Sequence, residues 1–572
     1  MAWLVSLVGA ALFPMSIIAQ SSTYVNPAVP TGTPIPGTYT GPLRPQVHFS
    51  PPKGFMNDPN GMFVDANGTW HLYYQYNPTG VVAGNQHWGH ATSTDLYHWV
   101  NQPIALFPPE ETVYVFSGSA VVDANNTSGF FPDQDNGVVA MFTLARYYEN
   151  GTAGPQTQNI AYSHDSGYTF DYYEQNPVID STSSQFRDPK VLWYQDHWVV
   201  AVAYAQEFVI GLWTSPDLKN WTFASNFSRH GLLGAQYECQ NLVPMPVKDA
   251  NGTVIDEKFV LAISIQPGAP YGGSITEYFI GDFNGTHFTP LDAAARLTDF
   301  AKDNYAAQFF SGIPGGQNQV NIGWASNWQY AQQVPTGNLE GWRSTMTAPR
   351  VKYLTEAPRI GLVMVEEPYD LSPILDTQLN TSTFESGTLA LDYSSVESGA
   401  LYLEVNVTNI NVTQLTAYST LNVSFASPAS GEILQSGFYF GGDNPFFINR
   451  GGIRGFDNIF FTDKFSTADV YSSGSSNPAS WSMQVVLDRS IFEVFLDRGI
   501  HAGTVVFYPT QPLTALNLAA NLPKGARVSV DIWSLKSTWA EFEDEQGTVL
   551  GNVTNSGNST SRNMIYKSNL SA

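Results

Sequence analysis

Three short segments of the chain each hold one carboxylate in a constrained backbone setting. Asp58 lies in an M-N-D-P-N-G segment, where Pro59 fixes φ and Gly61 permits a tight reversal. Asp188 lies in an R-D-P segment, and Glu238 precedes the single cysteine of the chain. An isolated N-D-P-N-G segment is more often a turn that closes a hairpin. Three carboxylates placed in this way match glycoside cleavage, which needs a nucleophile, an acid/base and a group that holds the sugar.

In this order, the M-N-D-P-N-G, F-R-D-P and E-C segments resemble those of glycoside hydrolase family 32. This family includes invertases, exo-inulinases and related fructosyltransferases. Similar segments extend from about Gln46 to Trp539, and the likeness is strongest to secreted fungal β-fructofuranosidases. The resemblance implies that Asp58 is the nucleophile that forms a covalent fructosyl-enzyme and that Glu238 is the acid/base. Asp188 would hold sugar hydroxyls and stabilise the transition state.

The resemblance also implies residues that bind the sugar. Asn57 and Gln75 would hydrogen-bond fructose hydroxyls, and Ser117 lies in an F-S-G-S segment that is similar to a pocket segment of the family. Arg187 would keep the neighbouring aspartate ionised. Trp328 would provide a platform for a sugar ring, although a buried blade aromatic is an alternative interpretation.

Two departures from the family pattern suggest a role for acceptor sugars. Gln240 and Asn241 follow Cys239, where many family members have a proline directly after the E-C pair. Ala83 stands where many members have a bulky tryptophan. We therefore predict that Gln240, with Asn85 and Gln86, orients a sugar acceptor, and neutral drift in the pocket wall is the alternative.

Composition excludes several classes of function. The 572 residues exceed one ordinary core, so at least two domains are expected. The net charge of −24 and the pI near 4.6 argue against nucleic acid or an anionic membrane as a partner. A neutral sugar is compatible with this surface.

No H-E-x-x-H, clustered Cys/His or glycine-rich phosphate motif occurs, so we predict no catalytic metal and no cofactor.

The chain has features of a secreted protein. An apolar run from Leu4 to Leu12 precedes Ser16–Ala19, which predicts a signal peptide at residues 1–19. The single cysteine, Cys239, forbids an intrachain disulfide. N-glycosylation sequons are frequent and begin at Asn67, Asn125, Asn126, Asn150, Asn220, Asn226, Asn251, Asn284, Asn380, Asn406, Asn411, Asn422, Asn552, Asn558 and Asn569. We expect an extracellular or cell-wall-associated glycoprotein, and a homodimer is compatible with the sequence.

The pattern of the chain indicates an all-β protein. A segment at residues 90–99 is echoed at 213–221 and, more weakly, at 162–170, each with an acidic turn before an aromatic residue. Repeated sheets of this kind favour a β-propeller, and the family resemblance implies five blades. Alternating strands beyond about 371 indicate a C-terminal β-sandwich. The expected order is a signal peptide at 1–19, an extended leader at 20–45, a catalytic propeller at 46–368, a sandwich at 369–540 and a polar tail at 541–572.

These features predict a retaining β-fructofuranosidase that hydrolyses sucrose and transfers fructose to sugars at high sucrose concentration. A dedicated fructosyltransferase that makes short fructo-oligosaccharides and an exo-inulinase are the alternatives. A sugar-binding protein without catalysis is a further alternative, and the presence of all three carboxylates argues against it.

Overall fold

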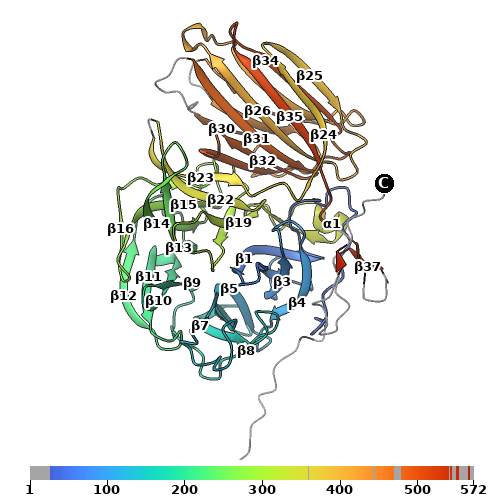
Figure 1. Ribbon diagram of the computed structural model, residues 1–572. Coiled ribbons are helices and arrows are strands. Elements are labelled where there is room, and N and C mark those ends of the chain that lie inside the picture. Colours follow the sequence, from blue (N-terminus) through green and yellow to red (C-terminus); the bar gives the residue numbers. More distant parts are fainter. Residues whose placement is uncertain are drawn as a thin grey trace, which may run out of the picture.

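The computed structural model describes residue 26 and residues 28–358, 360–441, 445–468 and 478–539, with the backbone of 541–543, 549–552 and 565–566. It contains a five-bladed β-propeller followed by a β-sandwich (Figure 1). The expected all-β fold class is therefore confirmed.

Within each propeller blade the strands pair antiparallel and follow one another in the chain, and a short parallel pairing of Val247–Lys248 with Leu354–Thr355 joins the fourth and fifth blades into one sheet. The first blade contains β1 (Gly54–Val64), β2 (Trp70–Asn77), β3 (His87–Ser93) and β4 (Val100–Leu106). The second contains β5 (Val113–Val122), β6 (Val138–Tyr147), β7 (Ala153–Ser163) and β8 (Asp171–Tyr172). The third contains β9 (Phe186–Tyr194), β10 (His197–Tyr204), β11 (Val209–Ser215) and β12 (Thr222–Ser228). The fourth contains β13 (Tyr237–Lys248), β14 (Val254–Ile265), β15 (Ile275–Phe283) and β16 (Phe288–Pro290). The fifth contains β18 (Tyr305–Phe309), β19 (Gln319–Ala325), β22 (Arg350–Ala357) and β23 (Gly361–Pro368).

Short elements complete the propeller. They are β17 (Arg296–Leu297), which pairs with β15, β21 (Thr345–Met346), which pairs with β19, a 3₁₀ turn (Ala205–Glu207) and α1 (Thr336–Glu340). The strand β20 (Trp342–Arg343) pairs in parallel with the start of β1. The last blade is thereby joined to the first, which closes the ring.

The echo in the sequence corresponds to the turn between the third and fourth strands of three blades. Asp95, Asp165 and Asp217 each accept two backbone N–H groups from residues two to four positions later, at 2.8–3.1 Å. A short acidic side chain stabilises such a turn by hydrogen-bonding the backbone that follows it. The repeated motif is therefore a structural element of the blade.

The C-terminal sandwich consists of two six-stranded antiparallel sheets. One sheet has the order β24 (Leu375–Phe384), β35 (Arg527–Leu535), β26 (Ala400–Ile410), β31 (Ala479–Asp488), β32 (Ile491–Leu496) and β33 (His501–Val506). The other has the order β25 (Gly387–Asp392), β34 (Ala515–Asn521), β27 (Thr420–Ala426), β28 (Ile433–Tyr439), β29 (Pro445–Gly452) and β30 (Lys464–Ala468). A short 3₁₀ turn (Val412–Gln414) follows β26. The alternating apolar residues of both sheets form one core between them.

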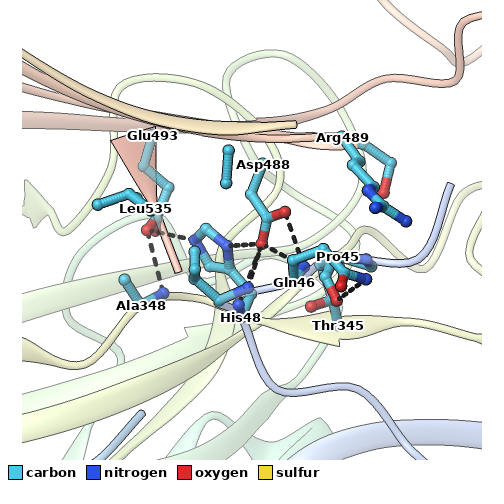
Figure 2. A network of polar contacts seen from close by, with 12 residues as sticks. Pro45, Gln46, His48, Thr345, Ala348, Asp488, Arg489, Glu493 and Leu535 are labelled. Carbon is cyan, nitrogen blue, oxygen red and sulfur yellow. Dashed lines mark hydrogen bonds and ion pairs between the residues drawn. The ribbon is translucent and has the colours of Figure 1, made fainter. Parts of the chain in front are cut away.

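A buried polar network joins the two domains (Figure 2). Asp488 accepts hydrogen bonds from the backbone N–H groups of Gln46, Val47 and His48 at 2.7–3.1 Å. The His48 ring contacts Asp488 at 2.9 Å and Glu493 at 3.1 Å, and Arg350 donates to Glu493 at 2.6 Å. Burial alone lowers the pKa of His48, but its bonds to the two carboxylates outweigh burial and raise it to about 9. The charges of this network are therefore paired inside the protein.

The strand positions support the expected domain limits, which we propose as 46–368 and 369–540. β23 ends at Pro368, and the first sandwich strand begins at Leu375. In the leader, residues 28–45 form no regular strand but bury several side chains against the propeller. The expected signal peptide lies outside the described residues. In the expected tail, β36 (Glu541–Glu543), β37 (Val549–Asn552) and β38 (Ile565–Tyr566) form a small sheet, and the other tail residues lie outside the described part.

Candidate active site

The three carboxylates meet at one end of the propeller axis. Asp58, Asp188 and Glu238 lie near the starts of β1, β9 and β13, the first strands of their blades. They line a cavity of about 260 Å³ whose wall is predominantly polar. The first strands of neighbouring blades are adjacent around the propeller axis. Residues at the same height along this axis therefore face one another. The sequence motifs are thus brought into one site.

A break in the hydrogen-bond ladder occurs at this level in all five blades. The register with the second strand shifts between Met56 and Pro59 in β1 and between Val115 and Gly118 in β5. It also shifts at Arg187–Lys190 in β9, between residues 238 and 241 in β13, and between residues 305 and 308 in β18. A bulge turns side chains away from the regular alternation of a strand. These bulges direct the site residues towards the axis.

Asp58 has one bonded and one unbonded carboxylate oxygen. Its Oδ2 accepts hydrogen bonds from Ser117 Oγ at 2.9 Å and from Cys239 Sγ at 3.3 Å. Its buried Oδ1 has no hydrogen-bond partner in the described part of the chain. Burial and then the charge of Glu238 raise the pKa of Asp58, while the side chains of Asn57, Ser117 and Cys239 act against them. The free Oδ1 is the atom that can form a bond to a substrate.

Glu238 is held from both sides. Arg187 donates to Oε1 through Nε at 3.2 Å and through Nη2 at 3.0 Å. The hydroxyl of Tyr305 donates to Oε2 at 2.5 Å. Arg187 Nη1 is itself held by Gln185 at 2.8 Å and by Gln156 at 3.3 Å. The orientation of the Glu238 carboxyl group is therefore set by two donors that are both buried.

Asp188 is supported by the residue that follows Glu238. The backbone N–H of Cys239 donates to Asp188 Oδ2 at 2.9 Å. Asp188 and Cys239 both have left-handed backbones, with φ of 65° and 45°, which non-glycine residues adopt at a cost in free energy. Burial raises the pKa of Asp188, Arg187 opposes this effect, and the charges of Glu238 and Asp58 add to it. Of the two neighbouring carboxylates, Arg187 hydrogen-bonds Glu238, whereas its Nε lies 4.0 Å from Asp188 Oδ2.

The other expected sugar-binding residues, with one exception, line the same cavity. Asn57, Gln75, Ser117 and Trp328 are all part of its wall. Gln75 Nε2 is bonded to a backbone carbonyl of β5 at 3.0 Å, and the Oδ1 of Asn57 is buried without a partner in the described residues. Trp328 is partly buried and packs edge-on against Trp324, with 4.8 Å between ring centroids and an interplanar angle of 60°.

Comparisons with known proteins place this arrangement in a family. The model of the glycosyl hydrolases family 32 N-terminal domain matches residues 48–360, and the model of the family 32 C-terminal domain matches residues 375–534. The chain belongs to glycosyl hydrolase family 32.

Relatives and solved structures agree with this family 32 assignment. The chain is 40% identical over 504 residues to an invertase of Wickerhamomyces anomalus, which covers 82% of this chain and 89% of that protein. It is 40% identical over 484 residues to an extracellular exo-inulinase of Meyerozyma guilliermondii, which covers 81% and 90%. A fructofuranosidase structure from Schwanniomyces occidentalis, complexed with fructose, is similar with a TM-score of 0.78 and 33% identity over 88% of this chain and 99% of that one. This family 32 member is therefore a glycoside hydrolase.

Gln240 does not line the cavity of this family 32 enzyme, contrary to the sequence-based prediction. Its side chain is fully buried, and its Nε2 donates to the backbone carbonyls of Asp188 and Ala201. It therefore supports the strand that carries Asp188 and offers no amide to a sugar. Asn85 Nδ2 donates to Thr79 at 2.9 Å, and neither Asn85 nor Ala83 lines the cavity. Gln86 does line it.

Several residues of this family 32 site were not predicted from the sequence. Tyr305 is the most important of them, because it donates to Glu238. The cavity-lining residues that were also not predicted are Phe116, Tyr147, Ala153, Gln156, Ser184, Gln185 and Gln236. Gln185 and Gln236 stand two residues before Arg187 and Glu238, so proximity to the motifs is a signal that could have found them. Tyr305 lies in no recognised motif, and only its position at the start of a first strand indicates its role.

The described residues of this family 32 chain contain no group of three or more His, Cys, Asp and Glu side chains that could hold a metal ion. Among the same residues, no helix has the length and apolar character needed to span a membrane.

Proposed function

We propose that this protein is a retaining β-fructofuranosidase that hydrolyses the terminal β-D-fructofuranosyl bond of sucrose. The observation that carries this proposal is the arrangement of Asp58 and Glu238 in one cavity. Asp58 has a free oxygen, and Glu238 is oriented by Arg187 and Tyr305. The similarity to an invertase over most of both chains supports sucrose as the substrate.

In the first step, Asp58 Oδ1 attacks the anomeric carbon of the fructosyl unit. The bond from this carbon to the bridging oxygen breaks, and Glu238 gives its proton to that oxygen, so glucose leaves. Ser117 and Cys239 hold Asp58 Oδ2 and thereby keep Oδ1 directed at the carbon. The product of this step is a fructosyl ester of Asp58.

In the second step, Glu238 removes a proton from a water molecule, which attacks the anomeric carbon and releases Asp58. Both steps pass through a transition state with positive charge on the fructosyl ring. Asp188, held by the N–H of Cys239, would bind ring hydroxyls and favour that charge. Two attacks from opposite faces retain the configuration at the anomeric carbon.

A trapping experiment tests this mechanism. The substrate is β-D-fructofuranosyl fluoride, because fluoride leaves without help from an acid. In the Glu238→Gln variant, loss of the base slows the second step, so the fructosyl-enzyme should accumulate. Mass spectrometry after rapid acid quench and proteolysis should find one anhydrofructose unit on Asp58. Attachment elsewhere, or inverted configuration in the released sugar, would contradict the assigned roles.

Two related activities stay open within the same mechanism. An extracellular exo-inulinase is as similar to this chain as the invertase is, so hydrolysis of terminal fructose from inulin is a second candidate. Transfer of fructose to a sugar acceptor starts from the same ester of Asp58, and Gln86 is the predicted acceptor-side residue that lines the cavity. The ratio of kcat/KM for sucrose to kcat/KM for inulin distinguishes an invertase from an exo-inulinase. The ratio of released glucose to fructose in concentrated sucrose measures transfer.

We also propose that the protein is secreted and acts outside the cell or in the cell wall. The signal-like segment at the start of the chain and the many sequons support this location, as does an extracellular relative. Protein in the culture medium that begins near residue 20 would establish it. The expected homodimer stays a prediction, which sedimentation velocity tests.

A further inference from the structure

The sequence Asn-Gly-Thr occurs four times in the chain, and three of these copies lie in turns that have the same backbone structure. The turns span residues 65–69, 148–152 and 249–253. In each, the N–H of the first residue bonds the carbonyl of the last threonine at 2.9–3.0 Å, and the glycine N–H bonds the first carbonyl at 2.8–3.0 Å. The three glycines have the same φ of 80°. The three asparagines, Asn67, Asn150 and Asn251, are all exposed.

These turns lie at opposite ends of the propeller. The turns at 65–69 and 249–253 follow the ends of β1 and β13, far from the starts of these strands, where Asp58 and Glu238 lie. The turn at 148–152 follows β6, which runs antiparallel to the first strand of its blade and therefore ends at the site. The residues that flank it, Tyr147 and Ala153, line the cavity of the carboxylates. Only this one of the three turns stands at the mouth of the site.

The turn at the mouth also differs in its own hydrogen bonds. In the two distant turns, the first residue is an aspartate whose Oδ1 holds the backbone of the asparagine and the threonine. At 148–152 an exposed tyrosine takes that place. Asn150 Oδ1 instead accepts from both the N–H of Thr152 at 3.0 Å and its hydroxyl at 2.7 Å. No described residue accepts a hydrogen bond from Asn150 Nδ2, so this nitrogen is open to solvent.

We propose that Asn150 carries an N-linked oligosaccharide that stands at the mouth of the site and excludes long fructans more strongly than sucrose. The inference rests on the proposed function for its effect on substrates and on passage through the secretory pathway for its attachment. The donor is an oligosaccharide linked to a lipid by a diphosphate, used by a membrane-bound transferase. Asn150 Nδ2 forms a bond to the anomeric carbon of the first sugar, the bond from that carbon to the diphosphate breaks, and the nitrogen loses one proton.

The expected effect is steric. Sucrose extends by only one sugar beyond a bound fructosyl unit, whereas a long fructan chain must continue out of the cavity, beside whose wall the 148–152 turn lies. A branched oligosaccharide on Asn150 occupies the space above Tyr147 and Ala153 and would hinder that extension. The same oligosaccharide on Asn251 stands at the other end of the propeller and would hinder nothing at the site.

The experiment uses the full chain secreted from a yeast host. Enzymatic deglycosylation in heavy-oxygen water, followed by peptide mass spectrometry, reports whether Asn150 becomes labelled aspartate. The variants are Asn150→Gln and Thr152→Ala, which both remove the sequon, and Thr152→Ser, which keeps it. Asn251→Gln is the matched control, because it removes a sequon from the same kind of turn at the distant end. For each, kcat/KM is measured on sucrose and on inulin.

We expect a labelled Asn150 and a rise of about threefold or more in the inulin-to-sucrose ratio for Asn150→Gln and Thr152→Ala. Thr152→Ser and Asn251→Gln should keep the wild-type ratio. An unlabelled Asn150, or a ratio that is the same in all variants, overturns the inference. If the wild-type protein cleaves neither sugar, the proposed function fails, and the labelling result still decides whether Asn150 is modified.

Discussion

The hydroxyl of Tyr305 lies 2.5 Å from Glu238 Oε2, on the side of the carboxyl group opposite Arg187. Tyr305 is fully buried, and burial raises the pKa of its phenol well above the usual value, so it stays a donor over the working pH range. Its role is to position Glu238. Because no sugar needs to contact Tyr305 for this role, the effect of its removal should appear in the catalytic steps more than in binding.

We predict that Tyr305→Phe lowers kcat by about 10- to 100-fold with little change in KM, because general acid–base catalysis depends on a correctly placed proton donor. Steady-state kinetics on sucrose measure this. With fructosyl fluoride the first step should be far less affected. Tyr172→Phe is the control, since the Tyr172 hydroxyl also donates a hydrogen bond, to the backbone carbonyl of Phe107 at 2.7 Å, but away from the site. Equal losses in both variants would indicate a general packing effect.

The two candidate catalytic carboxylates should differ in their response to the leaving group. Asp58→Asn and Glu238→Gln should each lower kcat on sucrose by several orders of magnitude while the protein stays folded. Fructosyl fluoride should partly restore the first turnover of Glu238→Gln but not that of Asp58→Asn. Burst kinetics of fluoride release measure the difference, and equal rescue would reverse or refute the assignment.

The pH profile should respond to the charge of Glu238. Asp58 must be ionised to attack, and burial followed by the Glu238 charge raises its pKa, so activity falls as the pH falls through that pKa. In wild type, general acid–base catalysis should give a bell-shaped profile with an acidic optimum. Removing the charge in Glu238→Gln should move the acid limb for fructosyl fluoride to lower pH. An acid limb that stays at the same pH in Glu238→Gln, or moves to higher pH, would argue against this effect of the Glu238 charge.

His48 should make stability depend on pH. Its folded pKa of about 9 exceeds the unfolded value of 6.5, so its contribution is complete below pH 6.5 and is lost as the pH rises through 9. The shift corresponds to about 3 kcal/mol of unfolding free energy. Chemical unfolding of wild type and His48→Gln should therefore differ most at pH 5–6 and converge towards pH 10. His197→Gln, which removes a partly exposed pair with Asp196, should change stability little.

Cys239 should be unreactive in the folded protein. Its thiol is buried, and burial together with the charges of Asp188 and Asp58 raises its pKa well above the ordinary value. Iodoacetamide at pH 8 should leave activity and mass unchanged, and the same reagent after unfolding in guanidinium should add one carbamidomethyl group. Loss of activity by alkylation of the native enzyme would contradict the burial of this residue.

Much of the site could be predicted because its carboxylates lie in short motifs with Pro, Gly or Arg neighbours that are readable in the sequence. Gln240 could not be placed correctly for a physical reason. Regular alternation in a strand would put it on the same face as Glu238. The pairing register of β13 with β14 shifts between Glu238 and Asn241, and Cys239 has a φ of 45°. The side chain of Gln240 therefore points away from the cavity.

The fold was predictable to a similar degree. The repeated segment at 90–99 and 213–221 forms the same turn in two blades, so it indicates a propeller. The number of blades followed only from the family resemblance. The bulges at the site do not follow from the alternation of apolar and polar residues, which predicts regular strands. Tyr305 was missed because its role depends on Glu238, which comes from another blade.

The bond from Gln46 to Asp488 spans 442 residues of chain, and Trp539 bonds the carbonyl of Pro45 and stacks on Tyr39. The N-terminal leader can therefore take its final place only after nearly the whole polypeptide has left the ribosome. Until then its buried side chains, such as Tyr39, have no partner from the C-terminal domain. During synthesis the leader therefore stays undocked until β35, the last strand of the sandwich, has been made and Trp539 follows it.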